Sequence, residues 1–223
     1  MTTLAFEFST DRRTAAVVHD GRCLAEVCHD ATRETPVGSM VRQVLAEAGA
    51  KPESIERVAI GLGPGSYTGI RLSLAWAHGW ALARGAGVVG ITSLEACLAQ
   101  LPGPSTSEPR SWLLVDAQRG EFYVQGLKSD NGFWRFSGAL ELSSKEAVQE
   151  LVSQGGGLFG PGLAKVLPSA IACFPTAREV GLLAESRSAV ADPGQLEPVY
   201  LRPVSFVKAP PVRQDLIDLA GPS

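Results

Sequence analysis

A glycine-rich segment between a predicted strand and a predicted helix is the first candidate for chemistry. Residues 63–69 read Gly-Pro-Gly-Ser-Tyr-Thr-Gly. Backbone N–H groups at a helix N-terminus attract anions, so a phosphate could bind there. The segment is not a Walker loop, because Ile70 and Arg71 follow Gly69, and Ser66 stands where the dinucleotide fingerprint needs its third glycine. The alternative is structural, a tight turn that lets helix and strand pack closely.

The sequence contains the residue types of metal and hydrolytic sites, but not at the spacings that those sites require. His19, His29 and His78 form neither an H-x-x-x-H nor an H-E-x-x-H pair, which favours ordinary histidines over a metal site. Ser66 does not lie in a G-x-S-x-G nucleophile elbow. We therefore predict no catalytic residue and no metal ligand. The cysteines lack a C-x-x-C pair and are predicted to be reduced and mostly buried: Cys23, Cys28, Cys97 and Cys173.

The first half of the chain predicts three consecutive strands and then strand–helix units. The dipeptide Asp20-Gly21 favours a hairpin turn between the second and third strands. Thr92 and Glu95 have the spacing of a capping box that opens a helix. Predicted strands cover residues 4–8, 14–19, 22–29, 57–61 and 88–91, and predicted helices cover residues 36–48 and 66–84.

The second half predicts nearly the same order of elements. Asn131-Gly132 again favours a hairpin, Ser143 and Glu146 are spaced as a capping box, and Gly160-Pro161-Gly162 is expected to lead into a further helix. Thr176 and Glu179 are expected to cap one more helix. Predicted strands cover residues 112–116, 121–127, 157–159 and a segment from residue 133 onward.

This repeat predicts an α/β protein of two tandem ribonuclease-H-like lobes, the actin/hexokinase/Hsp70-like (ASKHA) architecture. The lobes are assigned to residues 1–103 and 104–223, the second smaller and divergent, with a Pro/Ser/Gly-rich linker at 101–110. Ligands or partners of such folds lie between the lobes. Glu7 and Asp116 stand at equivalent strand ends. Since no glycine follows Glu7 and two arginines do, a structural acid is favoured over a magnesium ligand.

The predicted helix 66–84 is apolar nearly all round, which indicates burial on more than one side. Leu72, Trp76 and Trp80 lie one turn apart on one face. Core packing and a protein–protein interface remain open alternatives for this face. Small residues that would permit a close helix–helix approach are Gly69, Ser73, Ala77 and Gly79.

Charge and hydropathy limit the classes of partner. The net charge of −3 argues against a free-standing nucleic-acid binder. No segment has the pattern of a signal peptide or of a membrane span. With its unpaired cysteines, the chain is expected to be cytosolic.

Five stretches agree in order and spacing with one known family. They are residues 63–71 and 90–95 in the first half and residues 115–123, 159–163 and 197–202 in the second. On these stretches the chain resembles the TsaB (YeaZ) family. The motif residues that carry the resemblance include Gly63, Pro64, Gly65, Ser66, Thr68, Gly69, Arg71, Asp116, Arg119, Gly120, Glu121 and Tyr123.

The resemblance implies a non-catalytic scaffold subunit without a cofactor of its own. Its implied partners are a TsaD-like catalytic subunit and a TsaE-like ATPase, which hold ATP, magnesium and the metal and transfer threonylcarbamoyl to adenosine 37 of tRNA. Contact with tRNA is expected only through that complex, and a homodimer is expected when TsaD is absent. The implied interface lies on the first two helices, at Val37, Met40, Val41, Val44, Gly69, Leu72, Ser73, Trp76 and Trp80.

Several positions depart from the family pattern, and two other functions stay as alternatives. Glu7 stands where the family usually has Asp, Tyr67 replaces the more usual Phe, and Glu34-Thr35-Pro36 stands where a His is often found. The main alternative is an active small-molecule kinase or ATPase of the same architecture, suggested by the two-lobed repeat and the glycine-rich segment. A metalloprotease is the other, and the histidine count disfavours it.

Overall fold

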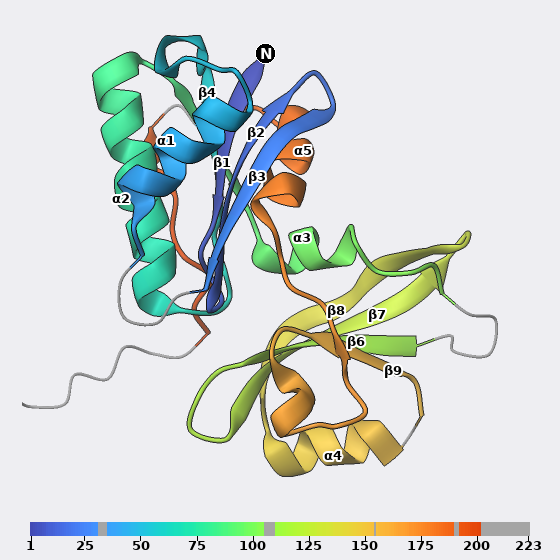
Figure 1. Cartoon of the computed structure of the whole chain (residues 1–223). Helices are drawn as coiled ribbons and strands as arrows, with labels where there is room; N and C mark the ends of the chain where they lie inside the picture. The colour runs from blue at the N-terminus through green and yellow to red at the C-terminus, as the bar shows by residue number, and fades with distance from the viewer. Residues whose placement is uncertain (31–34, 105–109, 154, 190–191, 202–223) are drawn as a thin grey trace, which may run out of the picture.

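The computed structural model describes residues 1–30, 35–104, 110–153, 155–189 and 192–201. Its elements form two five-stranded sheets with helices on their faces (Figure 1). Glu34, residues 105–109 of the predicted linker and Arg202 lie outside the described residues.

The first sheet has the strand order β3-β2-β1-β4-β5. Strands β1, β2 and β3 pair antiparallel, whereas β4 pairs parallel with β1 and with β5. The β2–β3 hairpin turns at Asp20 and Gly21, both at positive φ, as predicted. The strands are β1 (Thr2–Glu7), β2 (Arg12–His19), β3 (Arg22–Asp30), β4 (Arg57–Gly61) and β5 (Gly87–Ile91).

The second sheet repeats this order as β8-β7-β6-β9-β10. Its β7–β8 hairpin turns at Asn131 and Gly132, again at positive φ. Two sheets of the same order confirm the prediction of two ribonuclease-H-like lobes. The strands are β6 (Arg110–Asp116), β7 (Glu121–Asp130), β8 (Phe133–Ser144), β9 (Gly157–Gly160) and β10 (Ile171–Ala172).

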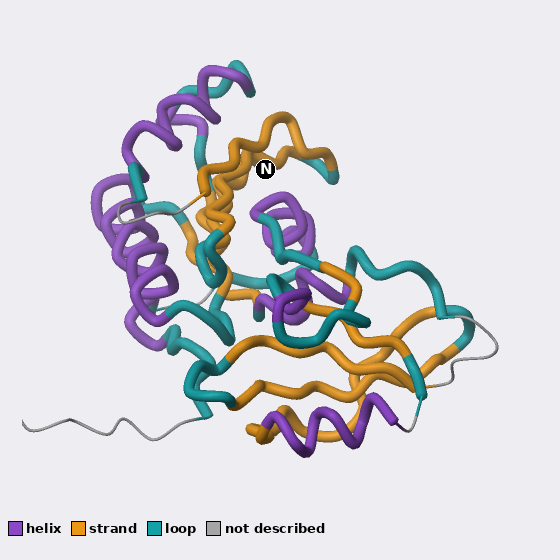
Figure 2. The backbone as a smooth tube through the Cα atoms, turned by 60° about the horizontal axis from the view of Figure 1, so that its bottom comes forward, coloured by secondary structure: helices purple, strands orange, loops and turns teal. Residues whose placement is uncertain are grey.

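Helices cover both faces of the first sheet. On one face lie α1 (Val37–Glu47), α2 (Tyr67–Arg84) and the short η1 (Pro52–Ser54); α5 (Ala177–Glu185) covers the other (Figures 1 and 2). An alanine-rich core cluster joins α5 to β1, β2 and β4, and the Ala177 N–H donates to Thr14 Oγ1 at 2.7 Å.

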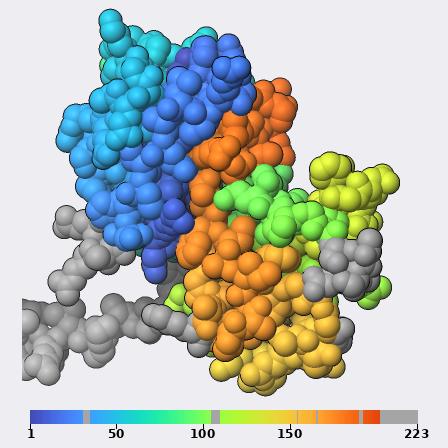
Figure 3. Space-filling view, turned by 45° about the vertical axis from the view of Figure 1, so that its right-hand side comes forward, coloured from blue at the N-terminus to red at the C-terminus, as the bar shows by residue number. Residues whose placement is uncertain are grey.

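This place of α5 differs from the predicted division of the chain. Residues 104–223 were assigned to the second lobe, yet α5 packs on the first sheet, in contact with its blue strands in the space-filling view (Figure 3). The chain then runs through η3 (Pro193–Gln195) along α2, where His78 Nε2 lies 2.8 Å from the Pro193 carbonyl oxygen. The predicted domain boundary between residues 103 and 104 stays a prediction.

The second sheet is also covered on both faces. One face packs on α4 (Lys145–Ser153) and η2 (Leu163–Lys165), and the other on α3 (Ser93–Leu98). The predicted helix after Gly162 is only the 3-10 turn η2. The Thr92–Glu95 capping box is confirmed. The Ser143–Glu146 box is wrong by one residue, because the side chain that accepts a backbone N–H at the start of α4 is that of Ser144, whose Oγ accepts the Ala147 N–H at 3.3 Å.

Candidate functional site

A cleft of about 790 Å³ lies between the two lobes, within the usual size of a small-ligand pocket. The β1–β2 turn and the start of α2 form one wall, and the β6–β7 turn and the loop after β9 form much of the other. Five of the family-motif residues line it, namely Gly65, Ser66, Asp116, Arg119 and Tyr123. Four of the five stretches on which the resemblance rests therefore contribute residues to this cleft, and residues 90–95 do not.

The glycine-rich segment closes on the protein's own backbone. The Ser66 N–H donates to the Ser9 carbonyl oxygen at 2.6 Å, and the Gly63 N–H donates to Ser93 Oγ at 3.1 Å. A Cβ atom at Gly65, whose φ is +150°, would overlap the Ser9 backbone. The peptide bond before Pro64 is cis. These contacts support the tight-turn interpretation, because two N–H groups that a phosphate would need already have partners.

Arg13 fills the space between the β1–β2 turn and the start of α2. Its side chain is only 7% exposed. One guanidinium nitrogen donates to the Phe8 carbonyl oxygen, and the other donates to Ser66 Oγ at 3.1 Å. A Cβ atom at Gly69 would overlap both the guanidinium and the Phe8 carbonyl. Burial lowers the pKa of Arg13, opposed by the charges of Asp11 and Glu7.

Glu7, the acid at the end of β1, is completely buried. Its carboxylate accepts the Ser9 N–H at 2.7 Å and the Ser93 hydroxyl at 2.8 Å. Burial raises the pKa of Glu7, against these hydrogen bonds and the nearby Arg13 charge. A Cβ atom at Gly61 would overlap the carboxylate, so strand β4 closes the site. Glu7 therefore does not fit the role of a magnesium ligand for ATP, and a structural role is supported.

The β6–β7 turn of the second lobe is more open. Asp116 is exposed, and its Oδ1 accepts the Gln118 N–H at 2.7 Å. Gln118, Arg119 and Gly120 all have positive φ, at 65°, 59° and 77°. Such backbone is costly for residues other than glycine and persists where the surroundings enforce it. The turn is held by the Glu121 N–H, which donates to the Gln118 carbonyl oxygen at 3.2 Å.

An aromatic stack closes the rim of the cleft. The rings of Tyr67 and Tyr200 lie 5.3 Å apart, and the Arg71 guanidinium lies 4.6 Å from the Tyr67 ring centroid. The Tyr200 hydroxyl is buried without a hydrogen-bond partner, and burial raises its pKa. Tyr200 belongs to the stretch 197–202 that carries the family resemblance, but its sequence context predicts no role for it. Thr68, in the same turn as Tyr67, is exposed.

The predicted interface residues occupy two different environments. Those of α1 and two of α2 are buried in the first lobe: Val37, Met40, Val41, Val44, Gly69 and Ser73. The other three are half-buried and pack against the same core: Leu72, Trp76 and Trp80. The buried six have almost no exposed surface in this structure, and their role in an interface stays a prediction.

The outer face of α2 carries a different set of residues. Arg71, Ala75, Gly79 and Leu82 are all exposed, Leu82 by 91%. A Cβ atom at Gly79 would meet nothing within 4 Å. Of the small residues thought to permit helix–helix approach, only Gly79 faces outward, since Gly69, Ser73 and Ala77 are buried. In the sequence, the sign of this face is Gly79, a glycine in the middle of a predicted helix where no turn requires one.

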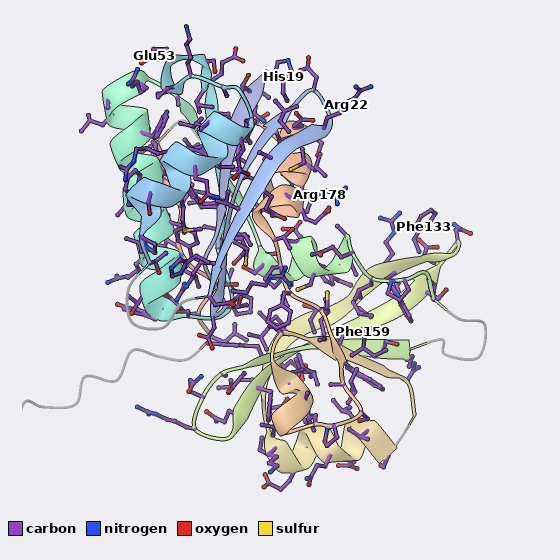
Figure 4. The ribbon with its side chains drawn as sticks, viewed as in Figure 1. His19, Arg22, Glu53, Phe133, Phe159 and Arg178 are labelled. Carbon is purple, nitrogen blue, oxygen red and sulfur yellow. The ribbon has the colours of Figure 1, made fainter. Side chains whose placement is uncertain are left out.

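Within the described residues, no group of three His, Cys, Asp or Glu side chains is placed to hold a metal ion. His19 lies at the tip of the first lobe (Figure 4), and its Nδ1 is 3.0 Å from Thr2 Oγ1. The sequence prediction of no metal ligand stays a prediction. Among the described helices, none combines the length and hydropathy needed to cross a membrane.

Comparison with known proteins gives one consistent answer. The profile of the family described as "TsaD: tRNA N6-adenosine threonylcarbamoyltransferase" matches residues 31–151. The chain is 28% identical to "tRNA threonylcarbamoyladenosine biosynthesis protein TsaB" of Escherichia coli (strain K12), over 91% of this chain and 95% of that protein. It is 26% identical to the protein of the same name from Haemophilus influenzae, over 94% and 98%.

A solved structure agrees with these relatives. "YeaZ from Pseudomonas aeruginosa" superposes with a TM-score of 0.70 at 27% identity, covering 90% of this chain and 99% of that one. The similarity therefore extends across both lobes.

Proposed function

We propose that this chain, which belongs to the TsaD family and within it to the TsaB (YeaZ) group, is a non-catalytic subunit in the synthesis of threonylcarbamoyladenosine on tRNA. In this proposal it binds a TsaD-like subunit, which performs the transfer, and works with a TsaE-like ATPase. ATP, magnesium and the metal belong to those partners, and tRNA is reached only through the complex. The complex is cytoplasmic.

The observation that carries the proposal is the outer face of α2. An exposed, nearly uncharged helix face formed by Ala75, Gly79 and Leu82 is unusual on a protein surface. The small side chains at positions 75 and 79 would let a partner helix approach closely, and Leu82 would bury apolar area on contact. Arg71 lies at the N-terminal end of this face and can fix the orientation of the partner.

The first lobe also supports the non-catalytic part of the proposal. In an ATP-using protein of this architecture, the first turn would be open to phosphate. Here the Arg13 guanidinium fills that space, and the Glu7 carboxylate has hydrogen bonds from Ser9 and Ser93. The same side chains fix the start of α2 on the sheet, so that its outer face is held by a rigid lobe.

The test is binding to the TsaD homologue of the same organism, measured by calorimetry on purified proteins. We expect Gly79→Arg and Ala75→Glu each to weaken binding by at least tenfold, because bulk and charge replace a close apolar contact. Gln149→Glu, on exposed α4 of the second lobe, is the matched control and should bind like the unchanged chain.

Equal binding of all four proteins would exclude this face as the interface. The isolated chain is expected to form a homodimer through the same face. Light scattering should therefore show a smaller dimer fraction for Gly79→Arg than for Gln149→Glu. Threonylcarbamoyl transfer to tRNA by the isolated chain, without a TsaD-like protein, would refute the non-catalytic assignment.

A further inference from the structure

The two chain segments that connect the lobes meet close to the end of α3. The first leaves α3 toward β6, and the second leaves β10 toward α5. Gln100 of the first segment donates its Nε2 hydrogens to the Phe174 carbonyl oxygen of the second at 3.0 Å and to the Ala96 carbonyl oxygen of α3 at 2.8 Å. This side chain therefore joins the two connections between the lobes.

Two cysteines face each other beside this contact, Cys97 near the end of α3 and Cys173 at the start of the second segment. The Cys97 thiol donates to the Cys173 carbonyl oxygen at 3.6 Å, and the Cys173 thiol donates to the Cys97 carbonyl oxygen at 3.5 Å. Each side chain thus lies over the backbone of the other residue. This reciprocal arrangement places each sulfur beside the backbone of the residue to which a disulfide would join it, and such a bond requires about 4.4–6.8 Å between the two Cα atoms.

We propose that Cys97 and Cys173 form a reversible disulfide that ties the end of α3 to the segment between β10 and α5 and restricts movement between the lobes. The two thiols are 1% and 8% exposed and pack in one apolar cluster with Leu94 and Phe159. Because both are buried, oxidation requires a brief opening of the hinge. The bond is independent of the proposed role in tRNA modification.

The chemistry proceeds by thiol–disulfide exchange with a low-molecular-weight disulfide such as oxidised glutathione. The Cys173 thiolate attacks one sulfur of the oxidant, and one glutathione thiolate leaves. The Cys97 thiolate then attacks the Cys173 sulfur of this mixed disulfide, and the second glutathione leaves. The two cysteines lose two protons and two electrons, and one oxidant becomes two glutathione thiols.

The order of attack follows from the environment of each thiol. The hydrogen bond from Cys97 lowers the pKa of Cys173, against its burial. The hydrogen bond with Cys173, together with burial, raises the pKa of Cys97. Cys173 is also the more exposed of the two. It is therefore expected to ionise first and to act as the attacking thiol.

The experiment treats the folded full chain with oxidised glutathione and maps disulfides by mass spectrometry after blocking the remaining thiols. We expect a linked peptide pair that contains Cys97 and Cys173, with a mass about 2 Da below the sum of the two reduced peptides that dithiothreitol restores, and slower hydrogen exchange in the connecting segments. Cys28, which is exposed, should instead form a mixed disulfide with glutathione.

Two pairs of variants make the outcome decisive. Cys97→Ala and Cys173→Ala should lose the linked peptides and the change in exchange, whereas Cys23→Ala and Cys28→Ala should retain both. If the folded chain gives no Cys97–Cys173 link, while the urea-unfolded chain forms disulfides under the same conditions, the proposal is wrong. A link between other cysteines of the folded chain would also overturn it.

Discussion

Helix α2 contains two glycines whose surroundings predict opposite effects of the same substitution. Gly69, in the first turn, lies against the Phe8 carbonyl and the Arg13 guanidinium, and Gly79 points into open space. We therefore expect Gly69→Ala to destabilise the protein and Gly79→Ala to stabilise it. The comparison is well matched, because both residues belong to the same helix and gain the same methyl group.

The expected size follows from two terms. Replacing glycine by alanine inside a helix gains about 1 kcal/mol from backbone entropy. At Gly69 the new methyl group would overlap a backbone carbonyl that cannot rotate away, so an overpacking cost near the upper end, about 3 kcal/mol, opposes this gain. The net change is a loss of about 2 kcal/mol at Gly69 and a gain of about 1 kcal/mol at Gly79.

Thermal unfolding followed by far-ultraviolet circular dichroism would measure the difference. At about 2–4 °C per kcal/mol for a chain of this size, the two midpoints should differ by roughly 6–12 °C. Urea unfolding followed by tryptophan fluorescence gives a second measurement, since Trp76 and Trp80 lie on α2 itself. If both variants shift in the same direction by similar amounts, the close packing at the start of α2 is refuted.

Three other predictions concern stability. Burial raises the pKa of Glu7 above its ordinary 4.5, so the folded state binds more protons than the unfolded state between these two pKa values. The free energy of unfolding should therefore fall as pH rises from about 4.5 through the raised pKa. Urea midpoints of the Glu7→Gln variant should not show this fall. Val44→Glu buries a charge and should cost more than about 4 kcal/mol, whereas Leu82→Glu should change urea midpoints little. Thr176→Ala removes the α5 cap and should cost about 1 kcal/mol in urea unfolding.

Features determined by neighbouring residues could be predicted from the sequence. The hairpins at Asp20-Gly21 and Asn131-Gly132 follow from residues that tolerate positive φ, and the Thr92 cap follows from its spacing to Glu95. The order of strands then followed from the repeat of these units. The cap of α4 differs from the prediction by one residue, because Ser143 and Ser144 are adjacent, both pair with β7, and the spacing alone does not show which hydroxyl faces the helix.

Features determined by distant contacts could not be predicted in this way. The amphipathic pattern of α5 shows that one face is buried, but not against which sheet. Helix α2 is apolar nearly all round, so its periodicity does not show which face is buried and which is exposed. Val44 on α1 is predicted to lie at an interface, although it is fully buried in the first lobe. Arg13 was seen only as an argument against phosphate, because its contact with Phe8 and Ser66 depends on how β2 and α2 meet.

The contact between Arg13 and α2 bears on the function of the whole lobe. A cation at a helix N-terminus opposes the helix dipole, and burial adds to that cost. The charges of Glu7 and Asp11 offset part of it. An anion such as phosphate would suit the helix dipole better, yet the space between turn and helix is filled by the guanidinium. The lobe thus uses these elements for internal packing, and a helix fixed at its start can present a fixed outer face to a partner.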